Sequence, residues 1–77
     1  MRTVTYGPGD WVYPADLPRR FLCRVIDAQR IRITGGCFQV LALEPVEGPW
    51  PAGTRLVREG AAVRPAEPPP EMTGHAA

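Results

Sequence analysis

A pair of glycines, Gly35-Gly36, stands between two segments in which apolar residues alternate with polar ones. Two adjacent glycines accept the positive φ angles of a two-residue hairpin loop without steric cost. Alternation with a period of two is the pattern of a half-buried β-strand. Residues 20–34 and 37–44 are therefore predicted to form one long antiparallel hairpin, against which the other segments pack.

Proline and glycine divide the remainder of the chain into short segments. In chain order, the predicted segments are a polar lead over 1–8, a strand over 10–14, a proline-rich loop over 45–53 held by Trp50, a strand over 54–58, one helical turn over 59–62 and a last strand over 63–65. Prolines fix φ and remove backbone donors, which excludes helix and interior strand from the loop. Residues 66–77 have almost nothing apolar to bury, so this tail is predicted to be disordered.

The first strand of the hairpin is predicted to bury one face. Its odd positions are apolar and are expected to point to the core: Phe21, Cys23, Val25, Ile31 and Ile33. Its even positions are expected to form an arginine stripe on the outer face: Arg20, Arg24, Arg30 and Arg32. A bend is expected near Asp27-Ala28.

The second strand of the hairpin is apolar on both faces. One face carries Phe38, Val40 and Ala42, and the other carries Leu41 and Leu43. An apolar face left bare marks a site of association. The face with the two leucines is therefore expected to be covered by the proline-rich tail, by the Trp50 loop or by another subunit.

Length and composition restrict the protein class. A chain of 77 residues forms one domain at most, and a domain this short buries only about 60% of its unfolded surface. All nine cationic residues are arginine, and lysine, serine and asparagine are absent, which suggests a GC-rich bacterial genome. A net charge of +1 gives no bulk attraction to nucleic acid or anionic lipid. The beginning of the chain has no signal-peptide pattern and no apolar run spans a bilayer, so we expect a cytoplasmic protein with no membrane partner.

Few residues are suited to catalysis or metal binding. The single histidine, His75, lies in the predicted tail, and the two cysteines lack the C-x-x-C spacing of a zinc site. Cys23 and Cys37 are expected to be buried free thiols, since the hairpin register keeps them apart. The carboxylates of Asp10, Asp16, Asp27 and Glu44 show no spacing that suggests a shared site. The sequence therefore predicts no enzyme, no cofactor and no metal.

The order of the predicted elements resembles that of an SH3-like small barrel. Gly9-Asp10-Trp11-Val12 is similar to the Gly-Asp-x-Val opening of many Tudor, KOW and CarD-type barrels, and a strand, turn and strand end at Val63. The resemblance covers residues 9–65. It implies an all-β fold: a single five-stranded SH3-like small barrel with one short helical turn, preceded by the lead over 1–8 and followed by the disordered C-terminal tail over 66–77.

The layout is also similar to that of the small plasmid-encoded type II dihydrofolate reductases. Their activity depends on a Val-Gln-Ile-Tyr segment that lines a pore between subunits. At the corresponding place this chain has Arg55-Leu56-Val57-Arg58, with neither the glutamine nor the tyrosine. An oligomeric pore enzyme is accordingly the last of three functional readings.

The first functional reading is a non-catalytic binding module. If Val12 points inward, Trp11 and Tyr13 point outward, and Trp50 on its loop can approach them to form an aromatic surface for a protein or peptide partner. Homo-oligomerisation through Leu41 and Leu43 would assist this binding. The second reading is a nucleic-acid-binding or transcription-associated barrel, in which the arginine stripe contacts phosphates.

Overall fold

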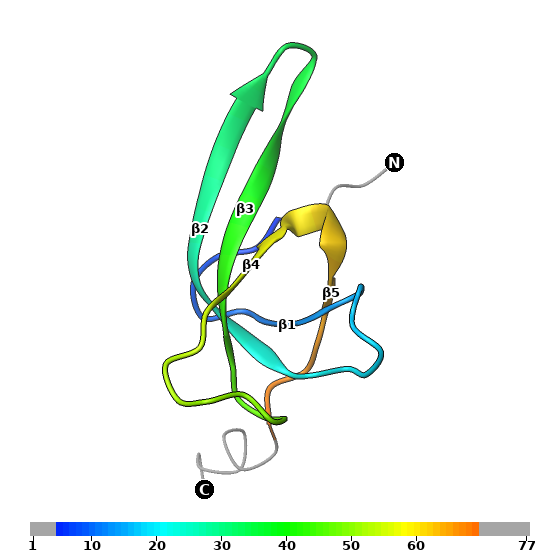
Figure 1. Cartoon of the computed structure of the whole chain (residues 1–77). Coiled ribbons are helices and arrows are strands. Elements are labelled where there is room, and N and C mark those ends of the chain that lie inside the picture. The colour runs from blue at the N-terminus through cyan, green and yellow to red at the C-terminus, as the bar shows by residue number, and fades with distance from the viewer. Residues whose placement is uncertain (1–4, 70–77) are drawn as a thin grey trace, which may run out of the picture.

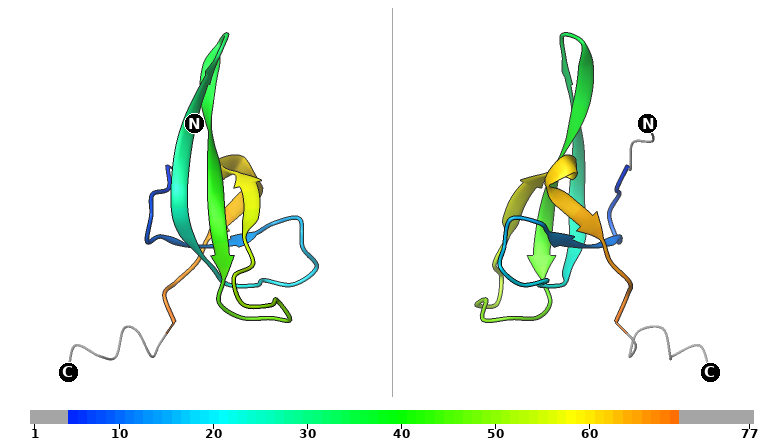
Figure 2. Two further views of the ribbon diagram at one scale, coloured as in Figure 1. Left: turned by 60° about the vertical axis from the view of Figure 1, so that its left-hand side comes forward. Right: turned by 90° about the vertical axis from the view of Figure 1, so that its right-hand side faces the viewer.

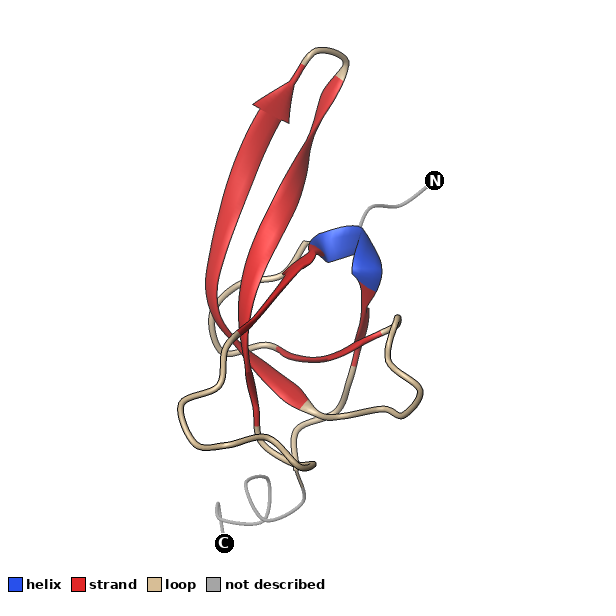
Figure 3. Cartoon of the chain, in the orientation of Figure 1, coloured by secondary structure: helices blue, strands red, loops and turns tan. Residues whose placement is uncertain are grey.

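The computed structural model describes residues 5–69 and contains five strands and one short helix (Figures 1 and 3). In chain order these are β1 (Trp11–Pro14), β2 (Cys23–Ile33), β3 (Gly36–Pro45), β4 (Leu56–Glu59), the 3-10 helix η1 (Gly60–Ala62) and β5 (Val63–Pro65). The predicted β-rich class is confirmed, as is the single helical turn before the last strand. Of the tail predicted to be disordered over 66–77, residues 70–77, including His75, lie outside the described residues, whereas the Ala66 amide donates to the Trp11 carbonyl oxygen at 2.9 Å.

All five strands belong to one antiparallel sheet with the order β4-β3-β2-β1-β5. Within residues 5–69, no ladder hydrogen bonds join the outermost strands, β4 and β5, so the expected closed barrel is not confirmed. The two edge strands are instead connected by η1, and an ion pair of Arg58 Nε with Asp16 Oδ1, at 3.0 Å, joins β4 to the loop that follows β1. The hydrogen bond from Arg58 lowers the pKa of Asp16 below its usual value.

The core lies on one face of the sheet and is filled mainly by residues from the central strands. Its buried members are Tyr6, Val12, Cys23, Val25, Leu41, Leu43 and Val63. The inward orientation predicted for Val12, Cys23 and Val25 is confirmed. The expectation that Leu41 and Leu43 face outward is wrong. Both leucines are fully buried, because Leu43 pairs with Val25 and shares its face.

A β-bulge in β2 explains this difference. The pairing of β2 with β3 shifts between Val25 and Asp27, so Ile26 is an extra residue in the ladder. Before the bulge the core face of β2 carries odd positions, and beyond it Ala28 pairs with buried Leu41. The core face of β2 therefore changes from odd to even positions along the strand.

The assignment of Ile31 and Ile33 to the core is consequently wrong. Ile31 pairs with Phe38, and Ile33 pairs with Gly36, on the face opposite Leu41. Ile33 is 56% exposed. The hairpin loop also differs from the expected one by a residue, because it consists of Thr34 and Gly35. Of Gly35 and Gly36, only Gly35 has a positive φ, 89°, so one glycine meets the conformational demand of the turn.

The N-terminal lead contributes to the core, which the sequence did not predict. Tyr6 is buried, and the side-chain amide of Gln39 on β3 pairs with its backbone. The Tyr6 amide nitrogen donates to Gln39 Oε1 at 2.9 Å, and Gln39 Nε2 donates to the Tyr6 carbonyl oxygen at 2.8 Å. Burial raises the pKa of the Tyr6 hydroxyl. The glutamine thus binds the lead as a neighbouring strand would.

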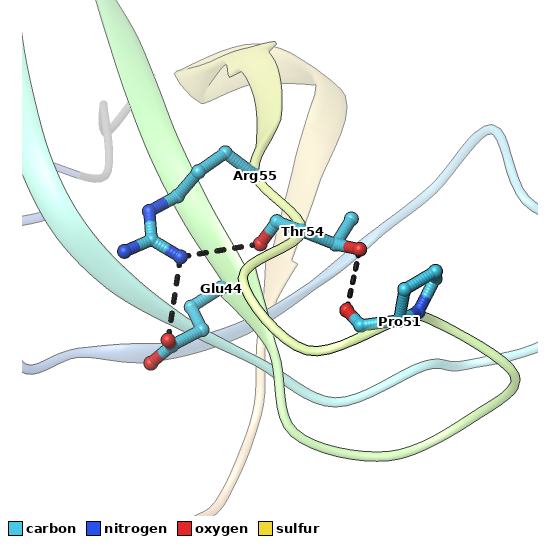
Figure 4. Close-up of polar contacts among 4 residues, drawn as sticks. All are labelled: Glu44, Pro51, Thr54 and Arg55. Atoms are coloured by element: carbon cyan, nitrogen blue, oxygen red, sulfur yellow. Dashed lines mark hydrogen bonds and ion pairs between the residues drawn. The ribbon is translucent and has the colours of Figure 1, made fainter.

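The loop between β3 and β4 is ordered by Trp50. Its ring meets that of Phe21 edge to face, with centroids 5.6 Å apart. Gly48 has a φ of 100°, and a Cβ placed there would lie 2.5 Å from Phe21 Cδ1 and 3.0 Å from Trp50 Nε1. At the far end of the loop, the Thr54 hydroxyl donates to the Pro51 carbonyl oxygen at 2.6 Å (Figure 4). The loop is therefore a packed element.

Candidate functional site

The far half of the β2-β3 hairpin projects beyond the rest of the molecule (Figures 1 and 2). In β2, only Cys23 and Arg24 pair with β1, and in β3, only Val40 to Leu43 pair with β4. Residues 29–39, which we call the arm, therefore have just two strands over most of their length. A two-stranded ribbon is marginally stable in water without a partner on one of its faces.

The arm has two chemically different faces. On the side of the core lie Arg30, Arg32, Cys37 and Gln39, which form its polar face. On the opposite side lie the arm residues Gln29, Ile31, Ile33 and Phe38, and this side continues into the adjoining three-stranded part of the sheet. This apolar face comprises Ile31, Ile33, Phe38, Val40, Ala42 and Val57. Its two most exposed members are Ile33, at 56%, and Val57 on β4, at 61%.

Charged residues border the apolar face at its base. Asp27 pairs with Ala42, and Glu59 pairs with Val40, so both carboxylates lie on this side of the sheet. Neither carboxylate forms an ion pair with another described residue. One row further from the tip, Glu44 accepts from Arg55 Nη1 at 3.3 Å (Figure 4) and pairs in the ladder with Arg24.

The four arginines predicted to form one stripe do not share a face. Arg24 lies on the side of the apolar face because it pairs with Glu44, whereas Arg30 and Arg32 lie on the polar face of the arm. Arg20 precedes β2, and its guanidinium carbon lies 5.2 Å from the centre of the Tyr13 ring. The bulge places Arg24 on one face of β2 and Arg30 and Arg32 on the other. Of the predicted stripe, only Arg30 and Arg32 remain neighbours on one face.

The three aromatic residues predicted to form a partner site are distributed over two places. Trp11 and Tyr13 are half-buried and share a face of β1. Tyr13 lines an open groove of about 390 Å³ at the end of the molecule away from the arm, together with Arg20, Leu22, Glu47, Pro65, Ala66 and Glu67. Trp50 packs on Phe21 and is not among the residues that line this groove. Tyr13 therefore belongs to the groove, whereas Trp50 packs its own loop against Phe21.

The thiols also occupy different environments. Cys23 is buried as expected, and its sulfur lies 3.4 Å from the Phe21 carbonyl oxygen. Burial raises the pKa of Cys23 to about 11, so the thiol is protonated at neutral pH and is a poor nucleophile. The expectation of burial is wrong for Cys37, which is exposed on the arm because this end of the hairpin lies beyond the core.

Within the described part of the chain, no group of three or more histidine, cysteine, aspartate or glutamate side chains is placed to hold a metal ion. No helix among residues 5–69 is long and apolar enough to cross a membrane.

Sequence reasoning missed the apolar face. The signal in the sequence is that both odd and even positions of the second hairpin strand are apolar. Such a strand has either both faces covered or one apolar face exposed. The sequence pattern assigns the wrong one of these two faces to the surface, because no local feature marks Ile26 as a bulge residue. It places Val57 only in a short strand.

No protein-family model, curated protein or solved structure matches this chain.

Proposed function

We propose that this chain is a small non-catalytic SH3-like module that binds a protein partner through the apolar face of its arm. The strand order β4-β3-β2-β1-β5, with a helical turn between β4 and β5, supports the SH3-like reading of the open sheet. Function cannot be read from such a fold, because small barrels host many activities. The proposal therefore rests on the surface itself.

The observation that supports it is the exposure of Ile33 and Val57 at the two ends of one continuous apolar face. Burying a side chain of this size gains about 1.5 to 3 kcal/mol relative to leaving it in water. Single exposed apolar residues are ordinary, whereas a contiguous apolar patch marks a site of association. Ile33 and Val57 are exposed, and the residues of the face between them, Ile31, Phe38, Val40 and Ala42, are half-buried.

This proposal shifts the main contact away from the expected aromatic surface. Tyr13 keeps a secondary part in it, since its groove is open and mixes apolar and charged residues. Trp50 serves the packing of its own loop against Phe21. Trp11 lies beside Arg24, on the side of the sheet that carries the apolar face, and extends that surface toward β1.

A matched pair of substitutions tests the proposal. Ile33→Glu places a charge in the apolar face, and Val46→Glu makes the same kind of change at a loop residue that is 47% exposed. Each tagged variant is purified from cells that contain the natural partners, and the recovered proteins are quantified by mass spectrometry. A partner recovered with the natural chain and with Val46→Glu, but lost with Ile33→Glu, supports the proposal. Equal recovery with all three chains contradicts it.

A second candidate function, nucleic-acid binding, is favoured by the polar face of the arm. Arg30 and Arg32 form no ion pair with another described residue, and no carboxylate occurs between Asp27 and Glu44. A two-stranded β-ribbon fits the major groove of DNA, and arginines contact phosphates.

Binding to a short duplex, measured at several salt concentrations, tests this candidate. The paired change Arg30→Gln and Arg32→Gln is expected to weaken binding and to lower the salt slope by about two. Arg24→Gln, on the other face, is the control and should leave both nearly unchanged. Binding that does not respond to salt contradicts nucleic-acid recognition.

A further inference from the structure

The outer edge of β2 is uncovered along the arm (Figure 1). β1 pairs with β2 only at Cys23 and Arg24. The segment before β1 extends this cover by one residue, because the Val25 amide donates to the Asp10 carbonyl oxygen and the Val25 carbonyl oxygen accepts from the Gly9 amide, both at 2.8 Å. Beyond Val25, no backbone hydrogen bond between residues 5–69 reaches this edge.

The register of the hairpin shows which backbone groups this edge presents. Ile33 and Gly36 close a two-residue loop, so they exchange their backbone hydrogen bonds. Along an antiparallel ladder, hydrogen-bonded pairs alternate with pairs that direct their N–H and C=O groups away from the partner strand. Every second residue of β2, counted back from the loop, therefore points these groups outward: Arg32, Arg30 and Ala28. We call residues 28–32 the arm edge.

The other edges of the sheet are protected, whereas the arm edge is not. The outermost strands β4 and β5 have only four and three residues, and β5 ends at Pro65. The outer edge of β3 on the arm lies beside the N-terminal lead, which Gln39 binds. The arm edge contains no proline and lies beyond the bulge. An edge without such protection is a template for a further strand.

The side chains of the arm edge define which strand would fit. A residue of an added strand shares a face with the β2 residue directly opposite it. Arg30 and Arg32 are exposed and form no ion pair with another described residue, so carboxylates fit opposite them. Ile31 and Ile33 lie on the other face, where apolar side chains fit. The complementary segment thus alternates apolar and acidic residues.

We propose that the partner protein adds an extended segment of alternating apolar and acidic residues to the arm edge, as an antiparallel strand. This inference rests on the function proposed above, because the added strand carries its apolar residues beside Ile31 and Ile33 and so widens the apolar face. Its acidic residues lie opposite Arg30 and Arg32 and exchange backbone hydrogen bonds with them. Main-chain bonds provide affinity in this kind of recognition, and alternate side chains provide specificity. An antiparallel strand matches every other pairing of the sheet.

A capped synthetic peptide, Val-Glu-Val-Glu-Val, tests the proposal in an amide NMR titration of the full chain. In the antiparallel register, the glutamate N–H groups point to β2 and those of the central and last valines point to solvent. We expect shifts at the amides of Arg30 and Arg32. Methylation of both glutamate nitrogens should weaken binding at least about tenfold. Methylation of the two valine nitrogens gives a peptide of the same composition and should leave binding nearly unchanged.

A second comparison tests the charges. Replacing both glutamates of the peptide by lysine places like charges opposite Arg30 and Arg32, which should also weaken binding at least about tenfold. The proposal is overturned if the natural peptide causes no shift at about 1 mM. It is also overturned if the two methylated peptides bind equally, or if the lysine peptide binds as well as the glutamate peptide.

A pair of variants separates this inference from the proposed function. Arg30→Pro removes an outward N–H group at an edge position, where proline is tolerated, and Arg30→Gln removes the charge alone. Loss of the cellular partner with both Ile33→Glu and Arg30→Pro supports strand addition, provided that circular dichroism shows both variants folded. A partner lost with Ile33→Glu but kept with folded Arg30→Pro overturns strand addition and leaves the proposed function in place. If Arg30→Pro does not fold, the methylated peptides decide, since they leave the chain unaltered.

Discussion

Arg24 and Arg30 lie on opposite faces of β2, although both occupy even positions of one continuous strand. The pairing of Arg24 with Glu44 and of Arg30 with Gln39 establishes the difference, and the extra residue Ile26 causes it. The same shift turns Ile31 and Ile33 away from the core and gives the arm its apolar face. One unpaired residue thus determines which surface the protein presents.

Uninterrupted alternation would place Ile33 in the core and Leu41 at the surface, whereas the bulge reverses these positions. The expected effects of substitutions on stability are reversed with them. Leu41→Ala removes a fully buried side chain and should lower the free energy of unfolding by about 2 to 5 kcal/mol. Ile33→Ala removes an exposed one and should change it by less than about 0.5 kcal/mol. Urea denaturation followed by tryptophan fluorescence measures both. A larger loss for the isoleucine than for the leucine would show that the faces are assigned the wrong way round.

Removal of the glutamine that holds the N-terminal lead should loosen the end of the core. Gln39→Ala leaves the amide and the carbonyl of Tyr6 without their partners, which costs about 1 to 3 kcal/mol. Hydrogen exchange at the Tyr6 amide should accelerate with it. Gln39→Glu is the informative comparison, because a carboxylate keeps the acceptor for the amide and loses the donor to the carbonyl. Unchanged exchange in the alanine variant would mean that the lead is held by other contacts.

The two thiols should differ in reactivity, and Cys23 should make the fold sensitive to alkali. In native protein at pH 8, a thiol reagent should modify exposed Cys37 and spare Cys23. Because burial raises the pKa of Cys23 to about 11 from its usual 9.0, the unfolded chain loses this proton first as pH rises. Stability is then complete below pH 9, declines between pH 9 and 11, and is reduced by about 3 kcal/mol above that window.

Cys23→Ala separates this titration from the general effect of alkali. The variant is less stable at neutral pH because of its smaller side chain, but its decline between pH 9 and 11 should be shallower than that of the natural chain. Tyr6, whose pKa burial also raises, contributes a decline of the same sign in both proteins. Identical slopes for the two chains would show that the thiol titrates alike in the folded and unfolded states.

Two loop glycines provide a matched test of the packing around Trp50. Gly48 and Gly53 both have positive φ angles, 100° and 84°. A Cβ at Gly48 would collide with the Phe21 ring, whereas none of the described atoms lies within 4 Å of one at Gly53. Gly53→Ala should lower the free energy of unfolding by about 1 kcal/mol, through backbone strain alone. Gly48→Ala should lower it by more, because the added Cβ also collides with the ring. Thermal unfolding compares them, and equal losses would mean that the ring yields without cost.

The sequence predicted the elements better than their orientation. The prolines and glycines at the ends of segments were enough to predict β1, the loop of Trp50, η1 and β5. Proline and glycine act locally, through their own φ angles and, for proline, the missing backbone donor. The faces of the hairpin depend on pairing across strands, where one bulge residue changes the parity of every later position. Ile26 has no local property that marks it as that residue.

The contribution of Tyr6 and the location of the candidate site were unpredictable for the same reason. Tyr6 lies in a lead without alternation, and its burial depends on Gln39, which follows 33 residues later. The apolar face combines residues of β2 and β3 with Val57 of β4, and their juxtaposition depends on the register of three strands. The packing of Trp50 on Phe21 also joins residues that are far apart in the sequence, which no local pattern predicts.

Photo-crosslinking in cells shows whether a protein covers the apolar face, without any assumption about which protein it is. A photoreactive phenylalanine analogue replaces Ile33 in one chain and Val46 in another, both being exposed apolar positions. We expect a discrete protein adduct from position 33 and none from position 46, with an adduct of twice the chain mass if the occupant is a second copy. No adduct from position 33, or equal adducts from both positions, would contradict it.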